Sequence, residues 1–289
     1  MPNITVTWHT MPNSPTVTYK QLTDDDLLAK RKHMYGGNHT NRYNKHQSNG
    51  KSKTTENVKY FKTDVVIERD DDFQYTAEVK KHLKLVLERF SDFPQFYFPD
   101  NKLYLHLDET ARGGSGYVTA NDSNTVEQHI FLPPTMPTQR GIVAEKLTKQ
   151  AAYGETGWDR AIRAYIIHEL GHVYHQLLNA SHFYCLGDLV TCRGGMVDRC
   201  NPFFPGPKPS NSNLNDFSYS NGLSAKFKDE LSSYACQQAN GGNEFVAEMF
   251  AGLLMGEEYS DDAMQQYRSF GGPDVDGVAG LMKDYTYRG

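Results

Sequence analysis

The stretch AIRAYIIHELGHVYH, residues 161–175, decides the fold of this 289-residue chain. Apolar residues recur through it three and four positions apart, which predicts a helix with a buried stripe. The stripe consists of Ile162, Ile166, Leu170, Val173 and, just beyond the stretch, Leu177. We therefore expect an amphipathic helix over residues 159–178.

The same stretch contains the pattern His-Glu-x-x-His, formed by His168, Glu169 and His172. Two histidines four residues apart lie on one helix face, where their rings suit two corners of a tetrahedral zinc site. Glu169 lies about 100° around the helix, so it can reach a water at the metal without binding the metal. The pattern therefore predicts zinc ligands in His168 and His172 and a general base in Glu169. His175 is expected to face solvent or to support a ligand.

A third zinc ligand is expected in the stretch NEFVAEMFAGLLM, residues 243–255. Glu244 falls in the first turn of a predicted helix, where the helix dipole favours a carboxylate. Glu248 lies one turn later on the same face of an otherwise apolar helix. Buried carboxylates need partners because burying a bare charge is costly. A metal would satisfy Glu244, and the ring N–H of a ligating histidine would satisfy Glu248.

Together, H-E-L-G-H and N-E-F-V-A-E resemble the gluzincin zinc metallopeptidases, whose third ligand is a glutamate on a second helix. The form E-F-V-A-E-M-F-A is most similar to the catalytic domain of anthrax lethal factor-like bacterial toxin peptidases. The similarity covers mainly residues 159–256. It implies a zincin-like fold and a zinc-dependent endopeptidase, secreted as a toxin or effector, that acts on a protein substrate.

The resemblance also assigns a role to each matching residue. It implies a zinc ion held by His168, His172 and Glu244, with Glu169 as the general base. It implies that Glu248 supports a ligand histidine from outside the metal's own ligand shell. Family members use a tyrosine shortly before the ligand glutamate to stabilise the oxyanion, and Tyr234 is the nearest tyrosine here.

Two other interpretations stay open at this point. Asp188 or Asp198 can replace Glu244 as the third ligand, as in zincins that use aspartate, although both lie in a cysteine-containing loop. Alternatively, the chain is a catalytically inactive zincin-like binding module. The intact Glu169 argues against such a module, because loss of the base is the simplest route to inactivity.

The rest of the chain predicts an α+β fold, with strands first and a mainly helical C-terminal half. We expect residues 1–57 to form a partly flexible, basic extension and 58–289 a catalytic domain with a cysteine-containing insertion at about 181–222. Strands are expected at residues 60–68, 102–108, 116–119 and 125–132, and helices at 76–90, 224–237, 243–256 and 260–269. In zincins the substrate pairs with an edge strand, for which residues 117–119 or 128–131 are candidates.

The charge distribution and the apolar runs of the sequence limit which binding partners and which cellular location we expect. Residues 1–62 hold ten Lys and Arg against four Asp and Glu, which is a charge of +6. Because the net charge of the whole chain is −5, the remaining residues together carry −11. An acidic body disfavours nucleic-acid binding, and no apolar run is long enough to span a membrane. The first residues lack the pattern of a signal peptide, so we expect secretion or host-cell delivery by another route, or else a cytoplasmic location.

The four cysteines, Cys185, Cys192, Cys200 and Cys236, contain no CxxC pair. A structural zinc site built from them is therefore not expected. Disulfides among them make physical sense if the protein works in an oxidising compartment. The substrate's sequence and the oligomeric state are not predictable from these features.

Overall fold

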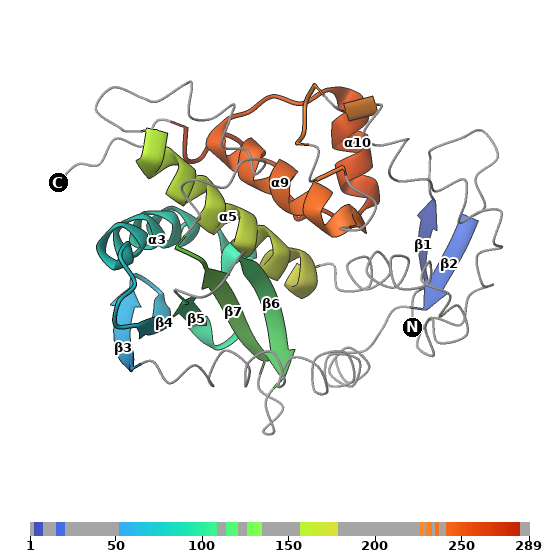
Figure 1. The fold of residues 1–289 in the computed structure, drawn as a ribbon. Coiled ribbons are helices and arrows are strands. Elements are labelled where there is room, and N and C mark those ends of the chain that lie inside the picture. Colours follow the sequence, from blue (N-terminus) through green and yellow to red (C-terminus); the bar gives the residue numbers. More distant parts are fainter. Residues whose placement is uncertain are drawn as a thin grey trace, which may run out of the picture.

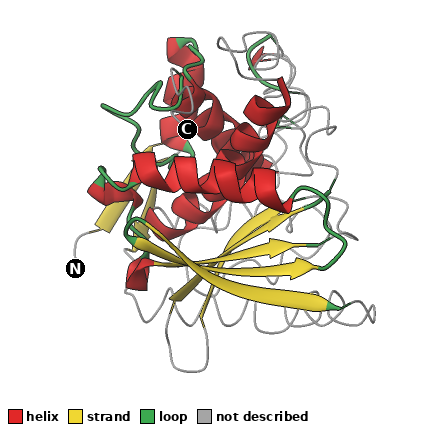
Figure 2. Cartoon of the chain, turned by 90° about the vertical axis from the view of Figure 1, so that its left-hand side faces the viewer, coloured by secondary structure: helices red, strands yellow, loops and turns green. Residues whose placement is uncertain are grey.

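A five-stranded mixed sheet and the helices on one of its faces form the body of the protein (Figures 1 and 2). We analysed a computed structural model that describes residues 3–7, 16–20, 52–108, 114–120, 126–134, 157–178 and 226–283, the last with gaps at 228, 233–234 and 237–240. The strands of the sheet are β3 (Lys53–Tyr60), β4 (Thr63–Asp70), β5 (Lys102–Leu107), β6 (Ser115–Ala120) and β7 (Val126–Leu132). A separate antiparallel hairpin pairs β1 (Asn3–Thr7) with β2 (Thr16–Lys20).

The strand order in the sheet is β3-β4-β5-β7-β6. The inner pairs β4–β5 and β5–β7 are parallel, whereas both outer pairs, β3–β4 and β6–β7, are antiparallel. β6 is therefore an edge strand, and β7 lies inside the sheet. Residues 117–119 therefore lie on the edge strand β6, and residues 128–131 lie on the inner strand β7.

The main helices are α3 (Thr76–Phe90), α5 (Gly157–Leu178), α9 (Gly241–Met255) and α10 (Asp261–Ser269), with short 3-10 turns at Pro94–Phe96 and Pro99–Asn101. In Figure 2 the helices stack above one face of the sheet. Alternate strand residues that face these helices are buried, including Val65, Ile67, Leu103, Leu105, Ile130 and Leu132. The mixed α+β class expected from the sequence is confirmed. None of the described helices has the length and apolarity needed to cross a membrane.

Helix α5 differs from the amphipathic helix that the sequence predicts. Every residue from Arg160 to Gln176 is buried, including the polar ones. The physical reason is that α5 lies between the sheet and α9, touching β6 and β7 on one side and α9 on the other. Its polar side chains therefore have to find partners inside the protein rather than in solvent.

The helix expected over residues 224–237 is not continuous. Lys226 and Phe227 are helical, but residues 229–232 form turns and irregular chain. Ser232 donates its backbone N–H to the carboxylate of Glu248 on α9, at 2.6 Å, instead of to a carbonyl one turn earlier. The Ser232 hydroxyl oxygen also accepts the Ala235 backbone N–H, at 3.1 Å, and side-chain bonds of this kind compete with those of a helix.

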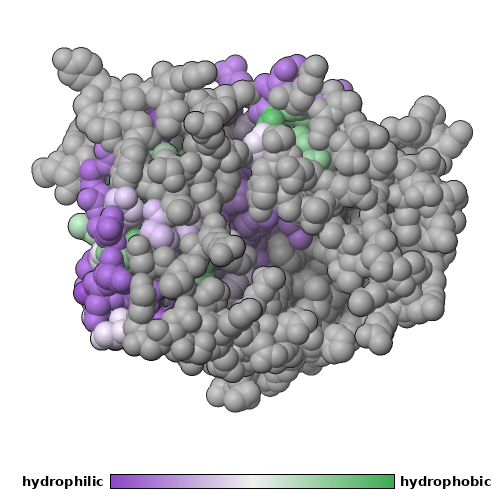
Figure 3. All heavy atoms as spheres, in the orientation of Figure 1, coloured by the Kyte–Doolittle hydropathy of each residue, from purple (hydrophilic) through white to green (hydrophobic). Residues whose placement is uncertain are grey.

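Hydrophilic side chains are prominent at the left of Figure 3, where the orientation of Figure 1 places β3 and β4. Lys53, Lys59 and Asp64 are exposed there. Charged residues along an edge strand oppose pairing with other chains. The two sheet edges therefore differ: β3 carries exposed charges, whereas β6 packs against the helix that holds the histidines.

Candidate metal centre

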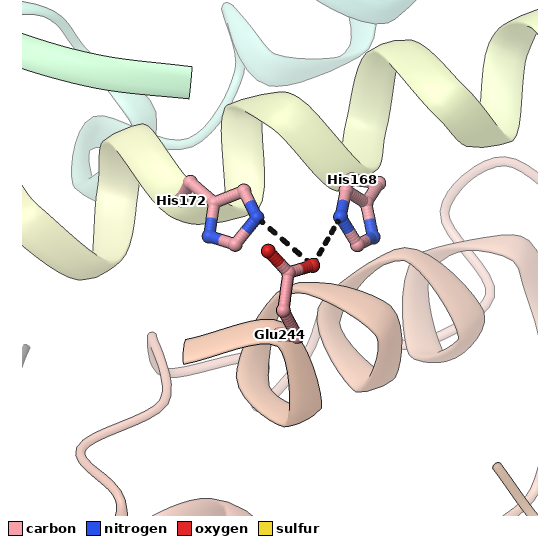
Figure 4. Close-up of side chains that lie close together, drawn as sticks. All are labelled: His168, His172 and Glu244. Carbon is pink, nitrogen blue, oxygen red and sulfur yellow. Dashed lines mark hydrogen bonds and ion pairs between the residues drawn. The ribbon is translucent and has the colours of Figure 1, made fainter. Parts of the chain in front are cut away.

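His168 and His172 of α5 converge on one carboxylate oxygen of Glu244 on α9 (Figure 4). The His168 Nε2 atom lies 3.2 Å from Glu244 Oε2, and the His172 Nε2 atom lies 3.4 Å from the same oxygen. These three residues are the group in the described part of the chain that can hold a metal ion. Tetrahedral zinc, with bonds of about 2.0–2.2 Å, places its ligand atoms roughly 3.3–3.5 Å apart. The three side chains can therefore hold a metal ion, and the two distances to Glu244 lie in the range of a tetrahedral site.

Gly171 is the reason that α9 approaches α5 closely enough to bring Glu244 to the histidines. A Cβ atom at this position would lie 3.1 Å from the Phe250 ring and 3.2 Å from the Ala247 Cα atom. A side chain at this position would require Phe250 or the α9 backbone to shift by a few tenths of an ångström. The glycine inside H-E-L-G-H thus permits the close packing of the two helices.

Burial and charge set the protonation of the three candidate ligands. Burial lowers the pKa of His168 and keeps the ring neutral, as a metal ligand must be. Burial, the largest single cause, acts to lower the pKa of His172, but the charge and the hydrogen bond of Glu244, together with the charge of Glu169, outweigh it and the pKa is raised. For Glu244, burial acts to raise the pKa, yet the charge of His172 and the hydrogen bonds from both histidines hold it far below its usual value. Glu244 is therefore ionised.

Glu169 lies with its carboxyl group against the chain just ahead of β6. Its side chain is buried, and its Oε2 atom has no hydrogen-bond partner among the described residues. Burial, the largest cause, raises the pKa of Glu169 to about 8. A Cβ atom at Gly114 would lie 2.2 Å from Glu169 Oε1, so the chain just ahead of β6 passes directly over the carboxyl group. A buried carboxyl group with a raised pKa beside a metal-type cluster is typical of a functional acid or base.

Glu248 lies one turn after Glu244 and is buried, as its place on α9 predicts. Its carboxylate accepts hydrogen bonds from the backbone N–H and the hydroxyl group of Ser232. The Nδ1 atom of His168 is buried and has no hydrogen-bond partner within the described residues. The expected support of a ligand histidine by Glu248 stays a prediction.

Several candidate residues lie outside the described ranges. Tyr234, the expected oxyanion donor, is one of them, and so are the alternative ligands Asp188 and Asp198. Three of the cysteines, Cys185, Cys192 and Cys200, and the insertion at about 181–222 lie there as well. Cys236 is a buried thiol, and burial raises its pKa to about 12. A thiol with such a pKa is not a reactive nucleophile at neutral pH.

His175 does not face solvent. It is buried, and its Nε2 atom lies 2.8 Å from the carbonyl oxygen of Phe270, just beyond α10. The ring nitrogen donates this hydrogen bond because a carbonyl oxygen can only accept. His175 therefore connects α5 to the C-terminal end of α10.

A second pair of histidines lies on the sheet. His106 of β5 and His129 of β7 place Nε2 and Nδ1 3.0 Å apart. The outer nitrogen of each ring meets a glutamate: Glu68 at 3.0 Å from His106 and Glu127 at 3.5 Å from His129. The four side chains form a line across the strands rather than a cluster around one point.

Sequence reasoning identified the metal-type cluster but missed the contacts between α5 and β6. Tyr165 accepts the Gly114 backbone N–H at 2.6 Å, and the Gln176 side chain bonds to the backbone of β6. A signal for Gln176 was present, because it is a polar residue one turn after His172 on a buried helix. Gly114 and Gly116 allow this segment to approach α5 closely, because a Cβ atom at either position would overlap Glu169.

No known protein family, curated protein or solved structure matches the chain. The functional interpretation therefore depends on the site itself.

Proposed function

We propose that the protein is a zinc-dependent endopeptidase of the gluzincin type, with a zincin-like fold. The observation that carries the proposal is the convergence of His168, His172 and Glu244, from two helices, at distances that suit one tetrahedral ion. Glu169 completes the His-Glu-x-x-His pattern and is buried beside the cluster without ligating it. Imidazole nitrogens with a carboxylate oxygen form a donor set that zinc prefers.

The open side of the site lies at Glu244. The Glu244 side chain is 18% exposed to solvent, whereas the His168 side chain is 2% exposed. Three protein ligands leave one position of a tetrahedral ion for a water molecule or a substrate, which is the arrangement of catalytic rather than structural zinc sites. When bound there, zinc supplies the positive charge that lowers the pKa of a water molecule, and of the nearby Glu169, toward ionisation at neutral pH.

Glu169 then acts as the general base. Its carboxylate accepts a proton from the water that attacks a peptide carbonyl and delivers that proton to the leaving amine. The burial that raises its pKa to about 8 also excludes bulk water, so the proton is exchanged with the reacting groups. Tyr234 is proposed as a donor to the oxyanion that forms on the carbonyl oxygen.

The substrate class follows from the edge strand. β6 lies next to α5, and an extended peptide can add to a sheet edge through main-chain hydrogen bonds. A protein or peptide substrate is therefore proposed. A secreted toxin or effector role, with a cytoplasmic location as its alternative, belongs to the same proposal because it derives from the lethal factor resemblance.

The test uses the full-length chain, its zinc content measured by mass spectrometry, and a quenched fluorescent casein as a general substrate. We expect about one zinc per chain and zinc-dependent cleavage. Glu169→Gln should keep zinc and lose at least about 10²–10⁴-fold in kcat/KM, because it removes the base but no ligand. Glu68→Gln, on the sheet, is the matched control and should cleave normally.

Two results would change this conclusion. Normal cleavage by Glu169→Gln would exclude the proposed mechanism. Full zinc occupancy without cleavage of casein or of a random peptide library would favour the inactive binding module.

A further inference from the structure

Gln176 connects the helix that carries the histidines to the edge strand. It lies one turn after His172 on α5, and its side chain is buried. The Oε1 atom accepts a hydrogen bond from the Val118 backbone N–H at 3.0 Å. The Nε2 group donates to the carbonyl oxygens of Gly116, at 3.1 Å, and of His172, at 3.0 Å. Both amide protons of Gln176 are therefore engaged.

The Gln176 amide takes the place of a peptide group from a neighbouring parallel strand. In a parallel pair of strands, a residue that lies opposite residue i of the neighbouring strand bonds to the residues on either side of i. It accepts from the N–H of residue i+1 and donates to the carbonyl oxygen of residue i−1. Gln176 does the same with Val118 and Gly116, which flank Tyr117. The outward edge of β6 is thus filled at this section by a side chain of α5.

The contact fixes the register of β6 above Glu169. A Cβ atom at Gly116 would lie 1.9 Å from the Glu169 backbone oxygen, and one at Gly114 would lie 2.2 Å from its carboxylate. Tyr165 holds the other end of this segment through the Gly114 N–H. Glu169 therefore lies along α5 between two hydrogen-bonded anchors, Tyr165 and Gln176.

We infer that Gln176 is a positioning residue of the proposed peptidase, which holds β6 in register on α5 and thereby sets the strand edge relative to the Glu169 carboxylate. It also occupies the hydrogen-bonding edge of β6 from Gly116 to Val118. This inference rests on the proposed function. It adds to that function the residue that positions β6 relative to Glu169.

The test compares Gln176→Met with Gln266→Met in the full-length protein. Methionine has similar length and volume but cannot make the three amide contacts. Gln266 is also a buried glutamine, but it lies on α10 and bonds to Ser269. Gln176→Met should lose about 10–100-fold in kcat on casein, with KM changed much less, because a shift of about 1 Å at the reacting groups has effects of this size. Zinc content should stay at the wild-type value, and Gln266→Met should cleave normally.

Hydrogen exchange at the Val118 amide reports the contact directly. Gln176→Met should lose protection there, whereas Gln176→Glu, which keeps the acceptor but not the donor, should retain part of both protection and activity. Wild-type kcat together with an unprotected Val118 would overturn the positioning role, and so would a loss confined to KM. If Gln176→Met does not fold, Gln176→Glu alone decides, and wild-type kcat in it with protection lost would contradict the inference.

Failure of the two proposals can be told apart. A wild-type protein that binds zinc but cleaves nothing would refute the peptidase function. Even then, full protection of the Val118 amide in Gln176→Met would refute the contact between Gln176 and β6.

Discussion

The pair of histidines on helix α5 and the pair on the sheet use the same residue types in different geometries. On α5 and α9, the His168 and His172 nitrogens converge on one oxygen of Glu244, at 3.2 and 3.4 Å. On the sheet, the contacts run in a line from Glu68 through His106 and His129 to Glu127.

The difference follows from secondary structure. Residues four apart on a helix direct their side chains to one point, and a second helix supplies the third atom. Residues on adjacent strands lie side by side, so their side chains form rows. The planes of the His106 and His129 rings are nearly parallel, with an angle of 16° between them, and one nitrogen of each ring contacts the other ring. Convergence, rather than the presence of histidine and glutamate, distinguishes the candidate metal centre.

The largest expected effect comes from removing a histidine of the pair on α5. His168→Ala or His172→Ala should lose most of the zinc and all measurable cleavage, because two remaining ligands hold zinc poorly. His106→Ala and His129→Ala are the matched controls and should keep about one zinc per chain. The zinc content of the four variants is measured by mass spectrometry. Equal zinc loss from variants of both pairs would contradict the claim that only the converging pair on α5 binds zinc.

The second prediction separates the carboxylates. Glu244→Ala should lose zinc about as severely as a histidine variant, whereas Asp188→Ala, Asp198→Ala and the sheet variant Glu127→Ala should not. Glu248→Ala should weaken zinc affinity or activity by roughly 10–100-fold, the usual effect of removing a group that supports a ligand.

Competition with a zinc chelator measures these affinities. Full zinc occupancy and activity in Glu244→Ala would favour an aspartate ligand instead. Equal, total loss in Glu244→Ala and Glu248→Ala would leave ligand and support indistinguishable.

The third prediction concerns the pH dependence of the metal-free protein. The pKa of Glu169 is about 8 in the folded state against 4.5 ordinarily, so the folded state binds more protons between these values. The free energy of unfolding should therefore fall by a few kcal/mol as pH rises from about 4.5 to about 8. Glu169→Gln cannot ionise, so in urea unfolding it should gain stability relative to the wild type at pH 8 and not at pH 4.5. The same difference at both pH values would contradict the buried, protonated Glu169.

The smallest expected effect is at the sheet pair. His129 packs between Tyr104 and Tyr117, with ring centroids 4.7 and 5.1 Å away. His129→Phe keeps this stacking and loses the contacts with His106 and Glu127. We expect a loss of about 1–2 kcal/mol in unfolding free energy, because polar partners become unsatisfied, and unchanged zinc content. A loss of zinc in this variant would connect the two pairs.

Local patterns predicted much of the fold. The spacing of apolar residues placed α3 at Thr76–Phe90, and alternation indicated β5 and the β6–β7 hairpin. The His-x-x-x-His spacing and the first-turn position of Glu244 predicted three residues that the structure brings together. Such features depend on residues close in sequence, and a single sequence contains them.

Features that depend on distant segments could not be predicted. The parallel pairing of β5 with β7 brings His129 to His106, and no local pattern indicates it. The role of Gln176 depends on β6, because its partner Val118 lies 58 residues earlier in the sequence. The buried His175 was misread because the sequence does not show that α10 covers it. Each of these is a property of tertiary packing.

The most direct test of the account is a crystal structure of the zinc-loaded protein with anomalous data collected at the zinc edge. We expect one peak, bound by His168 Nε2, His172 Nε2 and a Glu244 oxygen at about 2.0–2.2 Å, with Glu169 nearby but outside bonding distance. A peak at the His106–His129 pair or at an aspartate and cysteine site instead, or no peak in protein saturated with zinc, would contradict it.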